Sequence, residues 1–295
     1  MSDPRLNPDV DLKPELDLAL SVADVVDRFT LSHFTDRDFT VDWKSNQTEV
    51  TEIDRRAEKL IVDSLIAQRP DHGAFGEEHG VTGDESSPWR WVIDPIDGTS
   101  GYVRGIPIWA SLIALTHDNI PVLGVVSAPA LGVRWWGGVG LGAHVSARGD
   151  VRALAVSSVD ALSDAQVCIT HNSGWDQLGL TERLVEIQQE ARRSRGLGDF
   201  WQHMLVAEGA MDVAVDAVGV AAYDLAAIQP IVEAAGGTFT DRHGEPTHLH
   251  DTAISSNGIL HDEIIQSLAS PRHIGDRPQT DECVTMGTVP NVTEP

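Results

Sequence analysis

Cysteine and basic residues are scarce in this chain of 295 residues. The two cysteines, Cys168 and Cys283, lie far apart and share no motif, so a protein built on structural disulfides is not favoured. No apolar run reaches the length of a membrane span, and the polar, acidic start lacks the features of a secretory signal. From these absences we expect a cytoplasmic protein.

The shortage of positive charge limits the classes of molecule that this protein can bind. The chain has 21 Lys and Arg residues against 45 Asp and Glu residues, for a net charge of −24. A nucleic-acid-binding surface needs basic side chains to neutralise phosphates, and an anionic membrane needs them for the same reason. We therefore expect no nucleic-acid and no membrane partner. A small phosphorylated molecule can still bind, provided that cations mediate the contact.

The remaining composition is that of an ordinary globular protein, with 41% apolar and 22% charged residues. The length allows one large domain or two interlocked halves. We predict an N-terminal α+β half over residues 1–150 and a C-terminal αβ half over residues 151–270. Residues 271–295 have no periodicity and are expected to form a flexible tail.

Hydrophobic spacing predicts helices first, then a block of strands, then a mixture of both. A helix starts at Pro14, and a second runs from the N-cap Thr51 to Pro70, with Asp54 in its first turn. Strands are predicted at residues 90–94, 108–116, 122–129, 133–137, 166–171, 211–216 and 252–256. Further helices are predicted at residues 180–194, 200–210, 223–237 and 261–270. This order favours layered sheets and helices over a simple βαβ repeat.

The stretch RWVIDPIDGTSGYVRGIP, residues 90–107, places two aspartates at the end of an apolar strand. Asp94 and Asp97 are only three residues apart, and proline and glycine force turns around them. Two carboxylates held this close repel each other unless a positive species lies between them. That species could be a proton, an arginine or a metal ion.

Further acidic residues occur at the ends of other predicted elements. Glu77 and Glu78 stand in FGEEHG, Asp54 lies in the first turn of a helix, and Asp224 begins an apolar helix. Each has a plain structural explanation, as a loop charge or as an acid at the positive end of a helix dipole. Taken together they favour one cleft in which carboxylates hold a hard divalent cation such as Mg²⁺.

The segment WVIDPIDGT, with an upstream GEE and a downstream aromatic residue followed by Asp224, resembles the inositol monophosphatase superfamily of Mg²⁺-dependent, lithium-sensitive phosphatases. The resemblance extends from about residue 16 to about residue 269. It implies an α/β fold of the layered αβαβα type and a homodimer. It also implies two or three Mg²⁺ ions per active site, with Mn²⁺ as an alternative and Li⁺ as an inhibitor.

The resemblance also implies a ligand set. Glu77, Asp94 and the carbonyl group of Ile96 would hold the first metal ion. Asp94 would bridge to a second ion, which Asp97 and Asp224 would complete. Metal ions suit the chemistry, because monoester hydrolysis is very slow without catalysis and needs both an activated water and neutralised phosphate charge.

The same comparison implies roles for neighbouring residues. Thr99 and Glu77 would orient the attacking water, Asp54 would polarise Thr99, and Lys44 would lie near the outer metal ion. Backbone N–H groups around Gly98 and Thr99 could hold phosphate oxygens if a helix begins there.

The substrate is indicated by Gly198-Asp199-Phe200, where inositol phosphatases usually carry Gly-Thr-Ala. Here the chain is most similar to the histidinol-phosphate phosphatase branch, which implies hydrolysis of L-histidinol phosphate to L-histidinol and phosphate in histidine biosynthesis. An extra carboxylate could bind the cationic end of that substrate. Asp199 is the main candidate and Asp216 the second. Alternatively, Asp199 is only the N-cap of the following helix.

Some positions depart from the family pattern. Ser100, Gly101 and Tyr102 follow DGT where Asn-Phe is common, Tyr223 replaces a common tryptophan, and Glu49 replaces a common proline. None of these changes removes a metal ligand. Two alternatives stay open: an inositol-1-phosphate or other small-molecule phosphatase of the same fold, and a catalytically silent relative that acts as a binding or regulatory partner.

Overall fold

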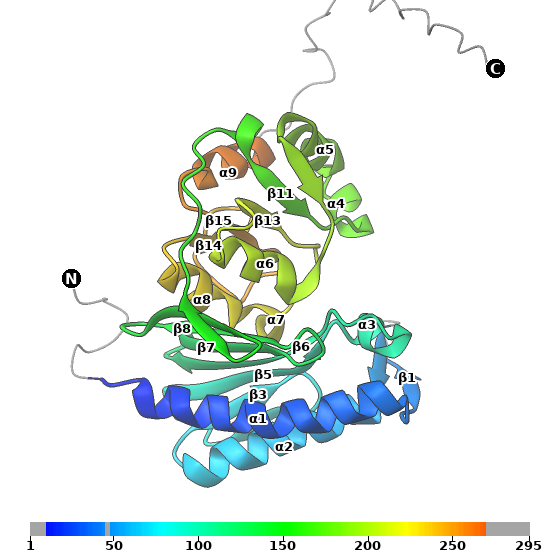
Figure 1. Ribbon diagram of the computed structural model, residues 1–295, viewed down its shortest axis with the longest axis vertical. Helices are drawn as coiled ribbons and strands as arrows, with labels where there is room; N and C mark the ends of the chain where they lie inside the picture. Colours follow the sequence, from blue (N-terminus) through cyan, green and yellow to red (C-terminus); the bar gives the residue numbers. More distant parts are fainter. Residues whose placement is uncertain (1–9, 45–47, 270–295) are drawn as a thin grey trace, which may run out of the picture.

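The computed structural model describes residues 10–44 and 48–269, which form alternating layers of helices and strands (Figure 1). Helices α1 and α2 cover one face of an eight-stranded sheet, and helices α6 to α8 lie between its other face and a five-stranded sheet. Further helices cover the far face of the second sheet. The predicted layered αβαβα fold is thus confirmed.

The first layer is formed by α1 (Lys13–Asp36) and α2 (Glu52–Gln68). Their apolar faces pack on the large sheet through residues such as Val22 and Ile61. The Thr51 hydroxyl accepts hydrogen bonds from the first turn of α2, and the Asp54 carboxylate accepts one from the Thr51 amide. This reciprocal cap explains why the helix starts at the predicted residue.

The large sheet has the order β10-β9-β8-β7-β6-β5-β3-β4. Its strands pair antiparallel except for β3 and β5, which are parallel. The bounds are β3 (Gly73–Gly76), β4 (Gly80–Gly83), β5 (Trp89–Asp97), β6 (Ala110–His117), β7 (Ile120–Ala128), β8 (Val133–Gly138), β9 (Gly142–Ala147) and β10 (Asp150–Ala153). The predicted strands agree with β5 to β8, while the sequence analysis missed β9 and β10, which are short and rich in polar and small residues.

The second sheet has the order β12-β11-β13-β15-β14. Its strands are β11 (Gln166–Ile169), β12 (Arg193–Arg195), β13 (Val213–Val215), β14 (Thr238–Thr240) and β15 (Ile254–Ser256). Its outer face is covered by α5 (Thr181–Glu190) and α9 (His261–Ala269), and the short elements η1 (Leu162–Asp164) and α4 (Ser173–Gln177) flank it.

Between the two sheets lie α6 (Asp199–Ala207), α7 (Ala222–Leu225) and α8 (Ile228–Ala234). The predicted single helix over residues 223–237 is wrong, because it is divided into α7 and α8. Pro230 has no N–H group to donate to the carbonyl of Ala226, so the regular helical ladder is interrupted at this point. The interruption leaves Asp224 near the end of a short helix that faces β5.

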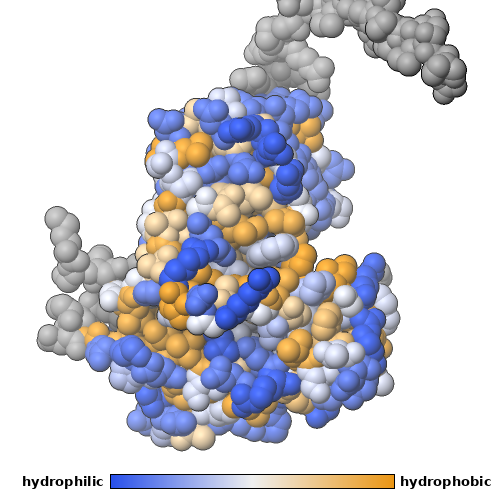
Figure 2. Space-filling view, viewed as in Figure 1, coloured by the Kyte–Doolittle hydropathy of each residue, from blue (hydrophilic) through white to orange (hydrophobic). Residues whose placement is uncertain are grey.

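Two smaller elements complete the described chain near the end of β5. A hairpin is formed by β1 (Val41–Trp43) and β2 (Glu49–Thr51), and α3 (Thr99–Arg104) follows β5 directly. Figure 2 shows an indentation of the surface between the part that carries α3 and the part that carries the second sheet.

Some sequence predictions are not tested by the fold. The proposed division at residue 150 falls inside β10 and stays a prediction. The predicted tail and Cys283 lie outside the described residues, whereas Cys168 is a buried free thiol. None of the helices in the described ranges combines the length and the apolar character that a membrane span requires.

Gly124 in β7 allows the middle layer to lie directly on the large sheet. A Cβ atom at this position would stand 2.0 Å from the carbonyl oxygen of Ala227, at the junction of α7 and α8. Because backbone atoms on both sides form this contact, a larger side chain cannot be accommodated by a change of rotamer. Gly124 therefore helps to set the distance between the large sheet and the segment that carries Asp224.

We expect Gly124→Ala to lower the free energy of unfolding by about 1–3 kcal/mol, the usual cost of overpacking a core. Urea unfolding followed by circular dichroism measures this change. Gly196→Ala is the control, because its Cβ atom would meet only the carbonyl oxygen of Ile169, at an ordinary 3.6 Å. Equal stability of the two variants would contradict the packing argument.

Candidate active site

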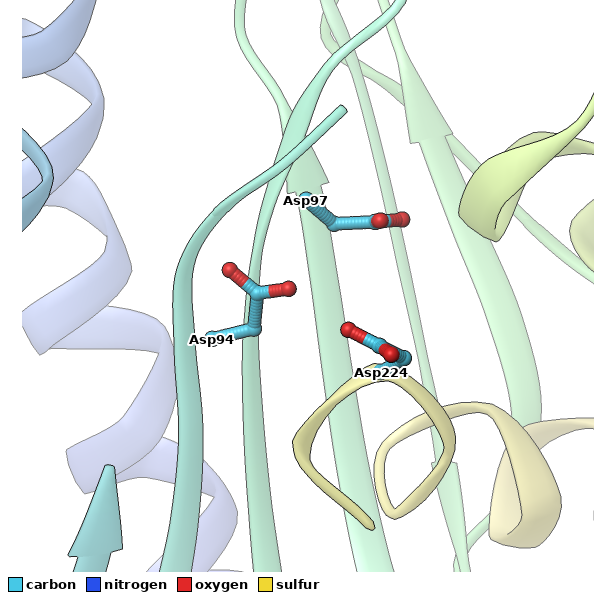
Figure 3. Close-up of side chains that lie close together, drawn as sticks. All are labelled: Asp94, Asp97 and Asp224. Atoms are coloured by element: carbon cyan, nitrogen blue, oxygen red, sulfur yellow. The ribbon is translucent and has the colours of Figure 1, made fainter. Parts of the chain in front are cut away.

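Asp94, Asp97 and Asp224 bring their carboxylates together at the end of β5 (Figure 3). One oxygen atom of each residue lies within 4.8 Å of the others. Residues three apart on a regular strand point to opposite faces. The β5–β6 register shifts between Asp94 and Asp97, next to Pro95, and this irregularity turns both side chains toward α7.

Backbone N–H groups from separate segments hold the three carboxylates. The amide of Ile96 donates to Asp94 over 2.9 Å. The amide of Phe200, at the start of α6, donates to Asp97 over 2.7 Å. The amide of Ala221 donates to Asp224 over 2.7 Å. Each carboxylate is therefore fixed from its own side, which leaves its other oxygen atom free to face the centre of the group.

The electrostatics of this group favour the uptake of positive charge. Burial raises the pKa of both Asp94 and Asp97 well above the usual range, and neighbouring carboxylates raise it further. Burial likewise raises the pKa of Asp224 to about 6. The three groups can all be ionised together only if a cation compensates them. Carboxylate oxygens in this arrangement fit a hard divalent metal ion.

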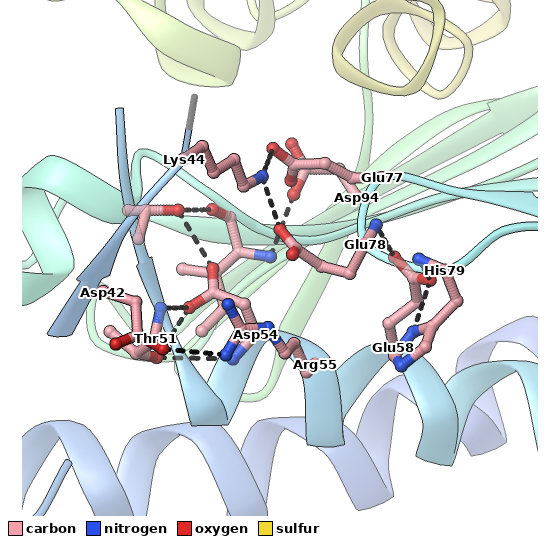
Figure 4. A network of polar contacts seen from close by, with 12 residues as sticks. Asp42, Lys44, Thr51, Asp54, Arg55, Glu58, Glu77, Glu78, His79 and Asp94 are labelled. Atoms are coloured by element: carbon pink, nitrogen blue, oxygen red, sulfur yellow. Dashed lines mark hydrogen bonds and ion pairs between the residues drawn. The ribbon is translucent and has the colours of Figure 1, made fainter. Parts of the chain in front are cut away.

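Glu77 and Lys44 form an ion pair near Asp94 (Figure 4). The Lys44 ammonium group donates to Glu77 over 2.7 Å and to Glu78 over 2.6 Å. Burial lowers the pKa of Lys44, but its bonds to the two glutamates outweigh this effect and hold the pKa above the ordinary value. Burial raises the pKa of Glu77 to about 7, although Lys44 opposes the shift. Lys44 therefore contacts the predicted metal ligand Glu77 directly.

Thr99 and Asp54 form the predicted pair. The Thr99 hydroxyl lies 3.0 Å from an Asp54 carboxylate oxygen and 2.9 Å from the carbonyl oxygen of Ile96. The other Asp54 oxygen accepts hydrogen bonds from the amide and the hydroxyl of Thr51. The residue that caps α2 thus also fixes the carboxylate that orients Thr99.

A pocket of about 310 Å³ adjoins the trio. It contains the two remaining acidic candidates, Asp199 and Asp216, and its wall includes Thr170, Asn172 and Val220. Burial and the charge of Asp216 raise the pKa of Asp199 to about 6. The wall of the pocket therefore carries Asp199 and Asp216 in addition to Asp97 and Asp224 of the trio.

Asp199 is not the N-cap that the alternative explanation required. Gly198 occupies that position, and no side-chain cap bond is present. Asp199 itself has a φ angle of 50°, in the left-handed region that few residues other than glycine adopt. Such backbone strain often accompanies a functional site, and here it accompanies a side chain that lines the pocket.

The departures after DGT leave the loop well anchored. Gly98, in left-handed conformation, is followed by α3, so a helix begins at Thr99 as the phosphate-binding expectation required. Tyr102 is fully buried, and its hydroxyl donates to the carbonyl oxygen of Thr30 over 2.8 Å. Its ring packs against Trp109. Tyr102, one of the residues that depart from the family pattern, therefore anchors the start of α3 to the core.

Sequence analysis missed Glu58, a fully buried acid one turn after Asp54. Its carboxylate accepts the backbone N–H groups of Glu78 and His79, each over 2.7 Å, and contacts the His79 ring (Figure 4). A Cβ atom on Gly76 would lie 2.3 Å from this carboxylate. The spacing of Asp54 and Glu58 on one helix face was the available signal, but the partners come from another segment.

A comparison with known proteins now identifies the family. The model of the inositol monophosphatase family matches residues 11–272. The chain belongs to this family. The histidinol-phosphatase of Streptomyces coelicolor is 43% identical over 260 residues, which are 86% of this chain and 97% of that protein. The histidinol-phosphatase of Mycobacterium tuberculosis is 43% identical over 256 residues, with the same two coverages.

Solved structures agree with this assignment. The extragenic suppressor protein suhB from Bartonella henselae has a TM-score of 0.79 to this chain at 25% identity, covering 87% of this chain and 98% of that one. The resemblance to the inositol monophosphatase family and the expected fold are therefore confirmed.

We expect Glu58→Gln to weaken Mg²⁺ binding about tenfold, because an amide cannot accept all of the hydrogen bonds that the carboxylate receives from the segment next to Glu77. Calorimetric titration of the metal-free protein with Mg²⁺ measures the affinity. Lys59→Ala, which removes an exposed neighbour on the same helix, is the control. Unchanged affinity in Glu58→Gln would show that this carboxylate does not support the site.

Proposed function

We propose that this protein hydrolyses L-histidinol phosphate to L-histidinol and phosphate, with Mg²⁺ as its cofactor. The observation that carries the proposal is the acidic pocket that joins the carboxylate trio to Asp199 and Asp216. A phosphate ester bound with its phosphate at the trio would extend its other end toward these two acids. The identity to two histidinol-phosphatases supports the same substrate.

The residues at the end of β5 fit a divalent cation. Asp94, Asp97 and Asp224 offer oxygen atoms within 4.8 Å of one another, and their pKa values are raised by burial in the absence of a compensating charge. We assign these three carboxylates as ligands, with Glu77 and the carbonyl group of Ile96 completing the set for two or three ions. Bound Mg²⁺ would neutralise charge on the phosphate and the leaving oxygen and would acidify a water molecule.

The protein's own groups would position the attacking water. Thr99 donates its single hydroxyl hydrogen to Asp54, which leaves an oxygen lone pair to accept a hydrogen bond from the water. Glu77 is the second acceptor and takes the proton that the water loses on attack. Such positioning accounts for a large part of the barrier reduction in many enzymes.

The start of α3 would hold the phosphate. Gly98 lets the chain turn tightly, since a Cβ atom there would lie 3.0 Å from the carbonyl oxygen of Ile108 and 3.4 Å from a carboxylate oxygen of Asp199. The N–H groups of Gly98 and Thr99 would donate to phosphate oxygens. The same close contact brings Asp199 next to the phosphate position, where it can reach the rest of the substrate.

The far end of the substrate would bind to Asp199 and Asp216. L-histidinol phosphate carries an ammonium group and an imidazole that can be cationic, so the buried Asp216 and the more exposed Asp199 complement it. Inositol phosphate offers only hydroxyl groups at this end and would leave both charges uncompensated. Lys44, placed on the opposite side beside Glu77, would favour the anionic phosphate end.

An inositol-1-phosphate phosphatase is the second candidate, since the family bears that name. The silent-relative alternative is weakened because every predicted metal-binding acid is present and Thr99 and Asp54 are in contact. A homodimer, a cytoplasmic location, Mn²⁺ as an alternative metal and inhibition by Li⁺ stay predictions from the resemblance and the composition.

The first test compares phosphate release from L-histidinol phosphate and from inositol 1-phosphate with Mg²⁺. We expect a kcat/KM at least a hundredfold higher for L-histidinol phosphate, because two charge contacts, one of them to the buried Asp216, separate the substrates. Asp199→Asn should reduce this preference about tenfold or more. A preference for inositol 1-phosphate would overturn the proposed substrate but leave the metal site standing, and no release from either would favour a silent relative.

The second test measures thermal unfolding with and without Mg²⁺. Mg²⁺ at about 100 times its Kd should raise the unfolding temperature by roughly 5 °C or more, because that excess contributes about 2.7 kcal/mol. Asp94→Asn should unfold at a higher temperature than the wild type without Mg²⁺, since it removes one of the repelling charges, and should gain little from the ion. Asp63→Asn, an exposed substitution, is the control. A normal response of Asp94→Asn to Mg²⁺ would contradict the ligand assignment.

A further inference from the structure

Asp216 is held from inside the protein by a chain of buried polar groups. One of its carboxylate oxygens accepts the N–H group of Ala217 over 2.8 Å. The other lies 3.2 Å from Nε2 of His203 on α6. His203 is fully buried, and its Nδ1 atom lies 2.8 Å from the hydroxyl of Ser255 on β15, which is also fully buried.

The chemistry of these groups determines which of them donate and which accept along the hydrogen-bonded series from Ser255 to Asp216. An ionised carboxylate can only accept hydrogen bonds, so we assign the proton of His203 to Nε2, where it faces Asp216 at 3.2 Å; the amide nitrogen of Gln202 is the more distant neighbour of the same atom, at 3.4 Å. In the neutral ring Nδ1 is then an acceptor, and the Ser255 hydroxyl must donate to it. Each donor therefore points from β15 through α6 toward the pocket, and both oxygens of Asp216 have a fixed partner.

The position of His203 on α6 links this hydrogen-bonded series to Asp199, the second acid of the pocket. His203 follows Asp199 by four residues on α6, and residues with this spacing lie on one face of a helix. One helix face thus presents Asp199 to the pocket directly and reaches Asp216 through the imidazole. The two carboxylates both line the pocket but approach it from different elements, α6 and the end of β13.

We propose that His203, oriented by Ser255, is a positioning residue that holds Asp216 in the orientation in which it binds the cationic end of the substrate. This inference rests on the function proposed above. The imidazole does not line the pocket, and it acts only through the carboxylate that does. Without its N–H donor, Asp216 would keep a single fixed hydrogen bond and could rotate away from the ligand.

The test uses the full-length enzyme and compares His203→Leu, His203→Gln and Ser255→Ala. The measured quantities are kcat and KM for L-histidinol phosphate and for glycerol 2-phosphate, which has no cationic group, and the calorimetric affinity for L-histidinol. We expect His203→Leu to raise KM for L-histidinol phosphate and Kd for L-histidinol about tenfold, the scale of one charge-assisted hydrogen bond. Kinetics with glycerol 2-phosphate should change less than twofold.

The other variants separate positioning from simple packing. His203→Gln places an amide N–H group near the former Nε2 position and should restore most of the affinity. Ser255→Ala should cause a smaller loss in the same direction. Met204→Ala, a change of the next and equally buried residue on α6, is the control that should lower stability without altering substrate preference. An equal loss with both substrates, or an equal change of preference in Met204→Ala, would overturn the proposal.

Asp216→Asn distinguishes this inference from the function on which it rests. If Asp216→Asn alone leaves the affinity for L-histidinol unchanged, the proposed role of His203 fails, and if Asp199→Asn leaves it unchanged as well, this pocket does not bind the cation and the substrate assignment fails. If Asp216→Asn weakens binding but neither His203→Leu nor Ser255→Ala does, only the role of His203 fails. Should His203→Leu not fold, as judged by circular dichroism, Ser255→Ala and His203→Gln still give both outcomes.

Discussion

The repulsion among three closely spaced carboxylates is the constraint on which the rest of this structure depends. Asp94, Asp97 and Asp224 have carboxylate oxygens within 4.8 Å of one another, and burial raises the pKa of each. Such a group destabilises the metal-free fold and becomes favourable when a cation binds. The strand irregularity after Asp94 and the short helix that carries Asp224 are the backbone features that bring these charges together.

The layered architecture supplies the rigidity that this arrangement needs. Two of the acids lie on a strand within the large sheet, while the third comes from the helices packed between the sheets. Gly124 lets that middle layer approach the sheet at backbone distance, and the buried ring of Tyr102 anchors the segment beyond β5. Packed layers of this kind deform little, so side chains from distant segments keep a fixed geometry.

The acidity continues beyond the metal-binding group into the pocket, and this continuity connects catalysis with substrate choice. Burying Asp216 with Asp199 beside it would be costly in an enzyme for a neutral polyol, but the two acids complement a substrate whose far end is cationic. Hydrogen-bond donors compensate part of the cost of burying an acid. Glu58 is an example, because its buried carboxylate accepts hydrogen bonds from backbone N–H groups of the segment next to Glu77. The function thus depends on closely spaced acids whose hydrogen-bond partners are provided by the fold.

The sequence by itself determined the family, the αβαβα class, most helices and central strands, and the acids that gather at the site, because capping residues, hydrophobic periods and the DPIDGT spacing are local signals. Only the tertiary structure decided the division of the helix around Pro230, the polar strands β9 and β10, the ion pair between Glu77 and Lys44, and the partners of Glu58 and His203. Hydrogen bonds between segments far apart in the chain have no period and no fixed spacing, so they arise only once the layers have packed.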